Sequence, residues 1–303
     1  MDYSDSVESP QKNGRFEFLW LDASERLVRT KNCSSLYGVS PKGPILTPRW
    51  STIERNIGSD WNDIRMPDYI DLPLIKGLIP RGIQFGSVLL VEFTPDSLWY
   101  EISLTIAAQV VRQSIGSEYH CLVHAPNAIR EAINKHGVDA DKLERDDALR
   151  IIDDYTGQVG LLKKTEITRE TSLKVADWSI LATQKLKSAD ERDKRRLHID
   201  DNTSVLSRYN KENEIIDYWR TRLIPISRTL EQVMIHSLVT GVHSEAFYNQ
   251  LESWHDGIVD VKNDEREGRL EHFMRVRIMR GSDHDSKWHR LKLLDNGEIT
   301  LAD

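Results

Sequence analysis

A short apolar run followed at once by a helical pattern is the feature that most restricts the fold of this chain. Residues 88–91 read Val-Leu-Leu-Val, which predicts a buried strand, and residues 99–113 carry apolar side chains at helical spacing. The alternation continues, with further strands expected at 120–124, 149–153, 197–200 and 234–240 and helices at 127–135, 173–187 and 215–222. The last of these helices is expected to be interrupted near Pro225 and to resume to Leu230. Strands that alternate with helices predict an α/β fold with a mostly parallel central sheet flanked by helices. Two closing strands, 257–262 and 269–280, are expected to be antiparallel.

The turn between the first strand and the first helix lacks the residues that such a turn usually carries. Strand, tight turn and helix form the frame of a phosphate-binding loop, which needs glycines to turn backbone N–H groups toward phosphates and a lysine to reach the terminal ones. Here the loop runs from Phe93 to Leu98, the nearest glycine is Gly86 before the strand, and Trp99 stands where the lysine would stand. The frame indicates an ATPase ancestor, and its contents indicate that this chain does not hydrolyse ATP.

The residues that stand in place of the phosphate-binding motif predict an ordinary turn and helix start instead. Phe93, Asp96 and Leu98 add Cβ atoms where a phosphate-binding backbone needs positive φ angles. Asp96 would place a carboxylate at the helix N-terminus, where it repels a bound anion. We expect Thr94 or Asp96 to cap the helix and Pro95 to occupy its first position. No cofactor is expected, because ATP and Mg²⁺ have lost their main partners.

Composition sets the wider limits. With 303 residues and 39% hydrophobic content, the chain can build a substantial core, and its net charge of −7 argues mildly against nonspecific nucleic-acid binding. No apolar run approaches the roughly 18 residues of a membrane-spanning helix, and the polar, acidic N-terminus resembles no signal peptide. Cys33 and Cys121 are expected to be reduced thiols, so we expect a cytoplasmic protein without a membrane partner.

Three regions are predicted along the chain. Residues 1–13 are interpreted as a disordered leader. Residues 14–65 are interpreted as an N-terminal extension in which 16–21 and 27–29 form a β-hairpin, followed by Gly- and Pro-punctuated loop. Residues 66–303 are expected to form the main domain, because the regular alternation of strands and helices begins there.

An ordered series of segments resembles the KaiC-like branch of the RecA superfamily of P-loop ATPases. The series comprises Ile-Pro-Arg-Gly at 79–82, the strand at 88–92, Asp-Gly-Ile-Val at 256–259, Arg-Gly-Ser-Asp-His at 280–284 and a closing Gly-x-Ile. The resemblance covers about residues 71–301 and implies a RecA-like fold. Residues 14–65 fall outside it.

The resemblance also implies which positions once held nucleotide, and most of them are changed. The family's loop reads roughly G-x-P-G-S-G-K-T-T. In this chain the vestigial loop positions are Phe93, Thr94, Pro95, Asp96, Ser97, Leu98, Trp99 and Tyr100, of which only Pro95 and Ser97 match. The family's pair of glutamates after the second strand is replaced by His124-Ala125-Pro126-Asn127. The Walker B aspartate matches Asp200. Of the family's Lys-x-Arg pair, Ile278 replaces the lysine, and Arg280 keeps an arginine that would lie at a subunit interface.

Two further groups of residues have competing interpretations. His284, His289, Asp283 and Asp285 could suggest a metal site, but the run is interpreted as a turn, and His120, His124 and His198 are interpreted as strand histidines, so no metal is expected. Arg220, Arg222 and Arg228, with Tyr209, Tyr218 and Trp219, form either a nucleic-acid patch or an amphipathic helix with an aromatic inner face; the helix is favoured.

These expectations lead to one main hypothesis and two alternatives. The main hypothesis is a non-catalytic KaiC-like protein, an inactive ATPase homologue that acts in signal transduction or assembly through protein contacts, as a homo- or hetero-oligomer with RecA-like subunits. The first alternative is a nucleic-acid-binding accessory protein that resembles the recombinase paralogues. The second is a protein that binds ATP without hydrolysis.

Overall fold

The computed structural model describes residues 20–21, 27–28, 69–156 and 173–302 and divides the chain into two units, Met1–Ile64 and Arg65–Asp303. In the first unit, β1 (Trp20–Leu21) pairs with β2 (Leu27–Val28) antiparallel, within the ranges 16–21 and 27–29 expected to form a hairpin. The leader at 1–13, Cys33 and the loop region at 29–65 lie outside the described residues. The boundaries of the three regions stay a prediction.

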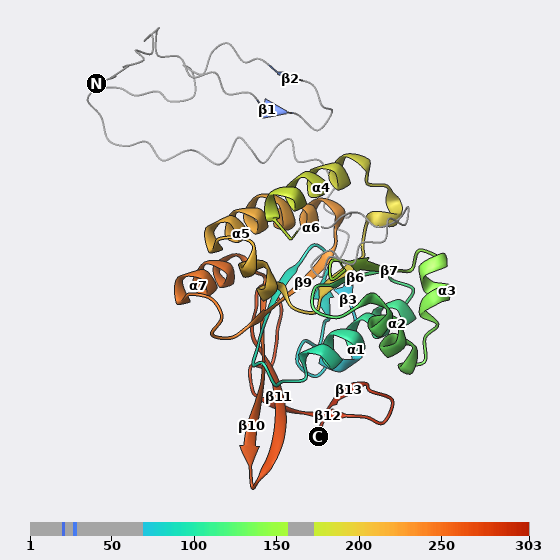
Figure 1. Ribbon diagram of the computed structural model, residues 1–303, viewed down its shortest axis with the longest axis vertical. Coiled ribbons are helices and arrows are strands. Elements are labelled where there is room, and N and C mark those ends of the chain that lie inside the picture. The colour runs from blue at the N-terminus through green and yellow to red at the C-terminus, as the bar shows by residue number, and fades with distance from the viewer. Residues whose placement is uncertain (1–19, 22–26, 29–68, 157–172, 303) are drawn as a thin grey trace, which may run out of the picture. The chain divides into compact units, whose positions relative to one another are not determined.

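The second unit is built on one nine-stranded sheet in the order β13-β12-β11-β10-β5-β9-β8-β6-β7 (Figure 1). The six strands from β10 to β7 run parallel to one another. These strands are β10 (Gly257–Arg266), β5 (Val88–Phe93), β9 (Val233–Val239), β8 (Leu197–Asp200), β6 (Ser117–Cys121) and β7 (Leu149–Asp153). The α/β fold with a mostly parallel sheet is therefore confirmed.

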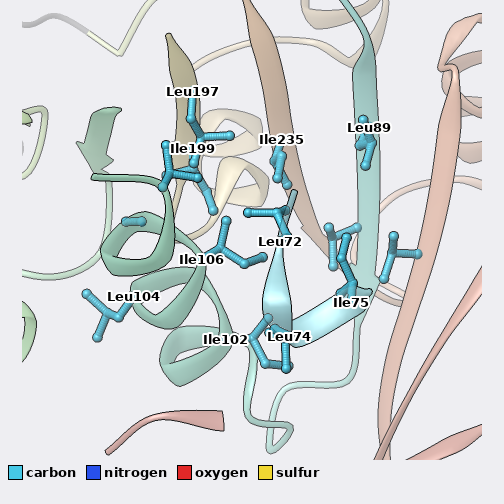
Figure 2. Close-up of a cluster of buried hydrophobic side chains, with 14 of the residues drawn as sticks. Leu72, Leu74, Ile75, Leu89, Ile102, Leu104, Ile106, Leu197, Ile199 and Ile235 are labelled. Carbon is cyan, nitrogen blue, oxygen red and sulfur yellow. The ribbon is translucent and has the colours of Figure 1, made fainter. Parts of the chain in front are cut away.

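Helices cover both faces of this sheet, as buried parallel strands require. One hydrophobic cluster joins the sheet to α1 (Trp99–Arg112), α2 (Pro126–Lys135) and α3 (Ala140–Arg145). Figure 2 shows part of this cluster, where Ile106 of α1 lies toward Ile199 and Leu197 of β8, and Ile102 lies beside Leu74. A second cluster joins the opposite face to α4 (Val175–Ser188), α5 (Glu212–Tyr218), α6 (Ile224–Leu230) and α7 (Glu245–Trp254).

The C-terminal strands extend the sheet in the antiparallel sense. β11 (Arg269–Met279) pairs with β10, β12 (His289–Leu293) with β11 and β13 (Ile299–Leu301) with β12. β10 pairs with β5 only over residues 257–261, so the remaining halves of β10 and β11 form a two-stranded hairpin beyond the parallel strands (Figure 1). The antiparallel closing strands are confirmed.

Two motif glycines are explained by close packing. A Cβ on Gly82, whose φ is +79°, would lie 2.3 Å from the Ile70 carbonyl oxygen, where β3 (Tyr69–Ile70) pairs with β4 (Ile83–Gln84). A Cβ on Gly257 would lie 2.8 Å from the Met279 sulfur. Both motifs therefore serve close packing between strands.

Several expected boundaries need correction. The second strand covers Ser117–Cys121 instead of 120–124. The helix near Pro225 is not interrupted, because a π-helical turn, Trp219–Leu223, connects α5 directly to α6 just before Pro225. The sequence patterns did not predict α3, α7, β12 or β13. No helix among the described residues is long and apolar enough to cross a membrane.

Candidate functional site

The candidate site is the loop from β5 to α1, at the carboxyl edge of the parallel strands, where α/β proteins bind ligands. Residues 93–98 all lie in the described part of the chain, and none of them has a positive φ angle. Anion-binding loops need a left-handed residue to bring successive N–H groups to one point. Instead, the Thr94 N–H donates to Val261 O at 3.1 Å and the Ser97 N–H to Thr94 O at 3.0 Å.

The expected helix cap was wrong. Leu98 is the N-cap residue of α1, with φ −85° and ψ 29°, and no side chain caps the helix. Thr94 Oγ1 instead pairs with Asn263 Oδ1 of β10 at 3.3 Å, and Asn263 Nδ2 donates to the Asp96 carbonyl at 3.4 Å. The helix begins later than the Thr-Pro-Asp pattern predicts. The contacts of Thr94 and Asp96 with β10 keep residues 94–97 in the loop.

Trp99 is part of the hydrophobic core. Its side chain begins α1 with only 2% of the residue exposed, and its ring lies 6.1 Å from that of Phe93. The indole Nε1 has no hydrogen-bond partner among the described residues. The position that the resemblance assigns to the phosphate-binding lysine is therefore filled by packed aromatic rings.

Asp200, the residue matched to the Walker B aspartate, lies at the end of β8 and is 2% exposed. Its carboxylate accepts hydrogen bonds from Thr203 Oγ1 at 2.6 Å and Ser237 Oγ at 2.6 Å, and lies 3.1 Å from His236 Nδ1. Burial alone would raise the pKa of Asp200, but these partners outweigh burial and lower it. The carboxylate is ionised and satisfied by protein groups.

Asp201, the next residue, holds the loop after β6 where the family has its glutamates. Its carboxylate accepts from the backbone N–H groups of Leu122 at 2.8 Å, Val123 at 3.1 Å and His124 at 2.9 Å. His124 Nδ1 lies 2.9 Å from the same carboxylate, and its ring stacks on Tyr100 at 4.0 Å. Burial and the Asp201 charge raise the pKa of Tyr100 to about 12, so its hydroxyl stays protonated.

Arg280 contacts the C-terminal end of α7. Its Nε donates to His255 O at 3.0 Å and its Nη2 to Glu252 O at 3.3 Å. Cations at a helix C-terminus stabilise the unpaired carbonyls there. The residue is exposed, and its place at a subunit interface stays a prediction.

The three arginines after β8 have different hydrogen-bond partners, and their role as a nucleic-acid patch stays a prediction. Arg220 pairs with Asp217 at 3.0 Å, whereas Arg228 forms two bonds, of 2.7 and 2.8 Å, with Asp256. Arg222 Nη1 donates to the carbonyl of its neighbour Thr221 at 2.9 Å. The aromatic residues Tyr218 and Trp219 are 7% and 1% exposed and belong to the core, as the amphipathic-helix interpretation expects, whereas Tyr209 is 45% exposed and does not.

Sequence analysis missed a buried ionic cluster directly before the loop. Glu92 is the last residue but one of β5. It lies 3.0 Å from Arg277, which also contacts Asp260 and Glu252 at 3.1 Å each. Burial, with a hydrogen bond to Glu252, raises the pKa of Glu92 to about 7. A glutamate inside an apolar strand was the signal in the sequence that could have indicated this cluster.

The histidines of the C-terminal turn have partners within that turn. His289 Nε2 lies 3.3 Å from Asp285, and His284 contacts Ser282 O.

Comparison with known proteins places this architecture in a family. The chain belongs to the KaiC family of ATPases, because the family's model, described as "ATPase: KaiC", matches residues 118–302 of its 303 residues. The matched range begins after the β5–α1 loop. The fold is similar to that of a KaiC-like protein from the hyperthermophilic archaeon Pyrococcus horikoshii OT3, with a TM-score of 0.62 and 13% identity over 78% of this chain and 100% of that one. No curated protein matches the sequence.

Proposed function

We propose that this chain is a non-catalytic member of the KaiC family that acts as a regulatory or assembly scaffold through protein contacts. The observation that carries the proposal is the burial of Trp99 at the position of the phosphate-binding lysine. Phosphoryl transfer depends on positioning and charge neutralisation of the phosphates, and that lysine is one of the main cationic partners. An indole inside the core supplies neither charge nor a reach toward a ligand.

Two other observations support the loss of nucleotide chemistry. Residues 93–98 adopt no left-handed conformation, so they lack the αR–αL arrangement that turns successive N–H groups toward an anion. Asp200 is already bonded to Thr203 and Ser237 and lies beside His236, and it would have to give up these partners to hold Mg²⁺. The loop conformation is unfavourable for phosphate binding, and the existing partners of Asp200 are unfavourable for Mg²⁺ binding.

The scaffold role is supported by the hairpin beyond the parallel sheet. In that part β10 pairs only with β11, and Leu270 near its tip is 55% exposed. A strand edge and an exposed apolar side chain are features by which proteins add a partner. RecA-like subunits that contact one another head to tail close into rings or grow into filaments.

Nucleotide binding is the first test. Calorimetric titration of the purified chain with ATP and Mg²⁺ is expected to give no binding heat, and phosphate release is expected to match buffer. A P-loop ATPase with an intact lysine, run in parallel, controls for the assay. Micromolar binding without hydrolysis would replace the proposal with the ATP-binding alternative, and turnover above buffer would refute it.

Particle size and nucleic-acid affinity test the scaffold part. Light scattering after size exclusion is expected to give an oligomer whose mass does not change when ATP is added. A monomer at micromolar concentration would contradict self-assembly. Titration of single-stranded DNA and RNA at low salt is expected to show no binding, because Arg220 and Arg228 are already paired with carboxylates. Salt-dependent binding would favour the accessory-protein alternative.

A further inference from the structure

A group of metal-ligand side chains lies on the face of the sheet that α4 to α7 cover, and the proposed function does not use it. Glu118 and His120 are two residues apart on β6, so their side chains point to the same face. His198 of β8 pairs with Glu118 across the sheet. The register of β6 and β8 therefore brings the three side chains together. Both strands belong to the central sheet, a rigid part of the fold.

The distances among these side chains match those of a bound ion. His120 Nε2 lies 3.2 Å from Glu118 Oε1, and His198 Nδ1 lies 3.4 Å from the same oxygen. A tetrahedral ion with bonds of about 2.0–2.1 Å separates its ligand atoms by about 3.3–3.4 Å. One ligand atom from each side chain lies within 4.8 Å of the others. An ion would therefore fit with little movement of the three side chains.

Asp154 is placed to orient the His120 ring, as carboxylates do for histidines that bind metals. Its Oδ2 lies 2.7 Å from His120 Nδ1, on the opposite side of the ring from Glu118. A histidine that donates Nδ1–H to a carboxylate presents its Nε2 lone pair at the other side. That lone pair then faces a carboxylate oxygen of Glu118, and two acceptors at this distance need a cation or a proton between them.

His198 places a third ligand atom at the same point. Its Nδ1 is buried and lies 3.4 Å from Glu118 Oε1, longer than a hydrogen bond of good geometry. Its ring lies 4.2 Å from that of His120. One divalent ion would contact all three ligand atoms.

Two cations near Glu118 oppose an ion. One is Arg150 of β7, whose Nη1 lies 3.8 Å from Glu118 Oε2, and the other is Lys185 of α4. Its Nζ lies 2.8 Å from Glu118 Oε1 and 3.0 Å from Oε2. Glu118 can give Oε1 to an ion and keep Oε2 for the lysine, whose side chain is 24% exposed and can move outward along its flexible stem. Because Nζ lies closer to Oε1, the oxygen that an ion would use, the lysine has to move for the ion to bind and therefore lowers the affinity for a cation.

From this geometry we infer that Glu118, His120 and His198 bind one divalent ion of the zinc class, with Asp154 as the outer partner of His120. Two imidazoles and one carboxylate are ligands that Zn²⁺ accepts, and three protein ligands leave one coordination position for water. This inference is independent of the proposed loss of ATP hydrolysis.

Metal titration of the full chain tests the inference. The chelator-treated protein is expected to bind one Zn²⁺ and, with Co²⁺, to show the intense visible absorption of a four-coordinate ion. His120→Ala and His198→Ala are expected to abolish this spectrum. Asp154→Asn is expected to weaken binding about 10–100-fold, as outer partners of metal ligands usually do. Lys185→Gln should strengthen it several-fold. His289→Gln, which removes a histidine paired with Asp285 on another face, is the matched control and should leave affinity unchanged.

Two results would overturn the inference. One is the absence of a cobalt spectrum and of stoichiometric zinc in the wild-type chain. The other is unchanged metal affinity in His198→Ala while circular dichroism shows that the variant is folded. If the alanine variants do not fold, X-ray absorption of the zinc-loaded wild type decides, because a ligand set other than two imidazoles and oxygen excludes this site.

Discussion

Replacing Trp99 by lysine restores the charge that a phosphate-binding loop needs, and we expect it to destabilise the fold without restoring ATP binding. An indole of this kind buries about 150–250 Å² of surface. At about 25 cal/mol per Å² this burial contributes about 4–6 kcal/mol. The unpaired Nε1–H offsets about 1–3 kcal/mol of that gain.

The net contribution of Trp99 is therefore about 1–5 kcal/mol. We expect a loss in the upper part of this range, because a buried Trp→Ala change usually costs roughly 3–5 kcal/mol. Trp99→Lys should cost at least as much, because a buried ammonium next to Phe93 has no partner. At about 2–4 °C per kcal/mol, the midpoint of thermal unfolding should fall by about 6–20 °C. Circular dichroism during heating measures this change.

Trp99→Phe is the matched control. It keeps an aromatic ring against Phe93 and removes the unpaired N–H, so its midpoint should stay close to that of the wild type. Calorimetry with ATP and Mg²⁺ is run on all three proteins. A Trp99→Lys variant that is as stable as the wild type and binds ATP would refute the view that this position belongs to the core.

Two further predictions concern groups beside the loop. Asp201→Ala removes the acceptor of three backbone N–H groups and a partner of His124, so it should lower unfolding free energy by about 3–5 kcal/mol in urea titrations, whereas Asp201→Asn should cost less. A loss below about 1 kcal/mol would contradict this role. Because the pKa of Glu92 is raised from 4.5 to about 7 in the folded state, its stabilising contribution is complete below pH 4.5 and is lost as the pH rises through about 7. The Glu92→Gln variant should therefore gain stability relative to the wild type between pH 5 and 8 in thermal unfolding, and a constant difference across this range would show the assignment to be wrong.

The arrangement of strands and helices was predictable from the sequence because it depends on the spacing of apolar residues. The runs at 88–91, 149–153 and 197–200 give strands with boundaries close to those expected. α7 was missed because it buries only Phe247 and Leu251, too few apolar positions for a clear helical pattern. Its usable signal was Ser244, which caps the helix by accepting from the Phe247 N–H at 3.2 Å.

The chemistry of the candidate site was less predictable, because it depends on contacts between residues far apart in sequence. The cap of α1 was wrong because Asn263 of β10 holds Thr94 and Asp96 in the loop, and nothing near the loop in sequence indicates that contact. Likewise, His120 and His198 were interpreted as separate strand histidines. Only the pairing of β6 with β8 brings them to Glu118.

The proposed loss of a nucleotide site is compatible with an intact fold in the β5–α1 segment. The strand, the turn and the helix are held by residues such as Leu89, Ile102 and Ile106, which face the core (Figure 2). In the proposed function, Trp99 at the lysine position adds to that core, so Trp99→Lys removes stabilising burial before it restores any contact with a phosphate. We expect ATP binding to require glycines in the loop as well, since none of residues 93–98 is left-handed.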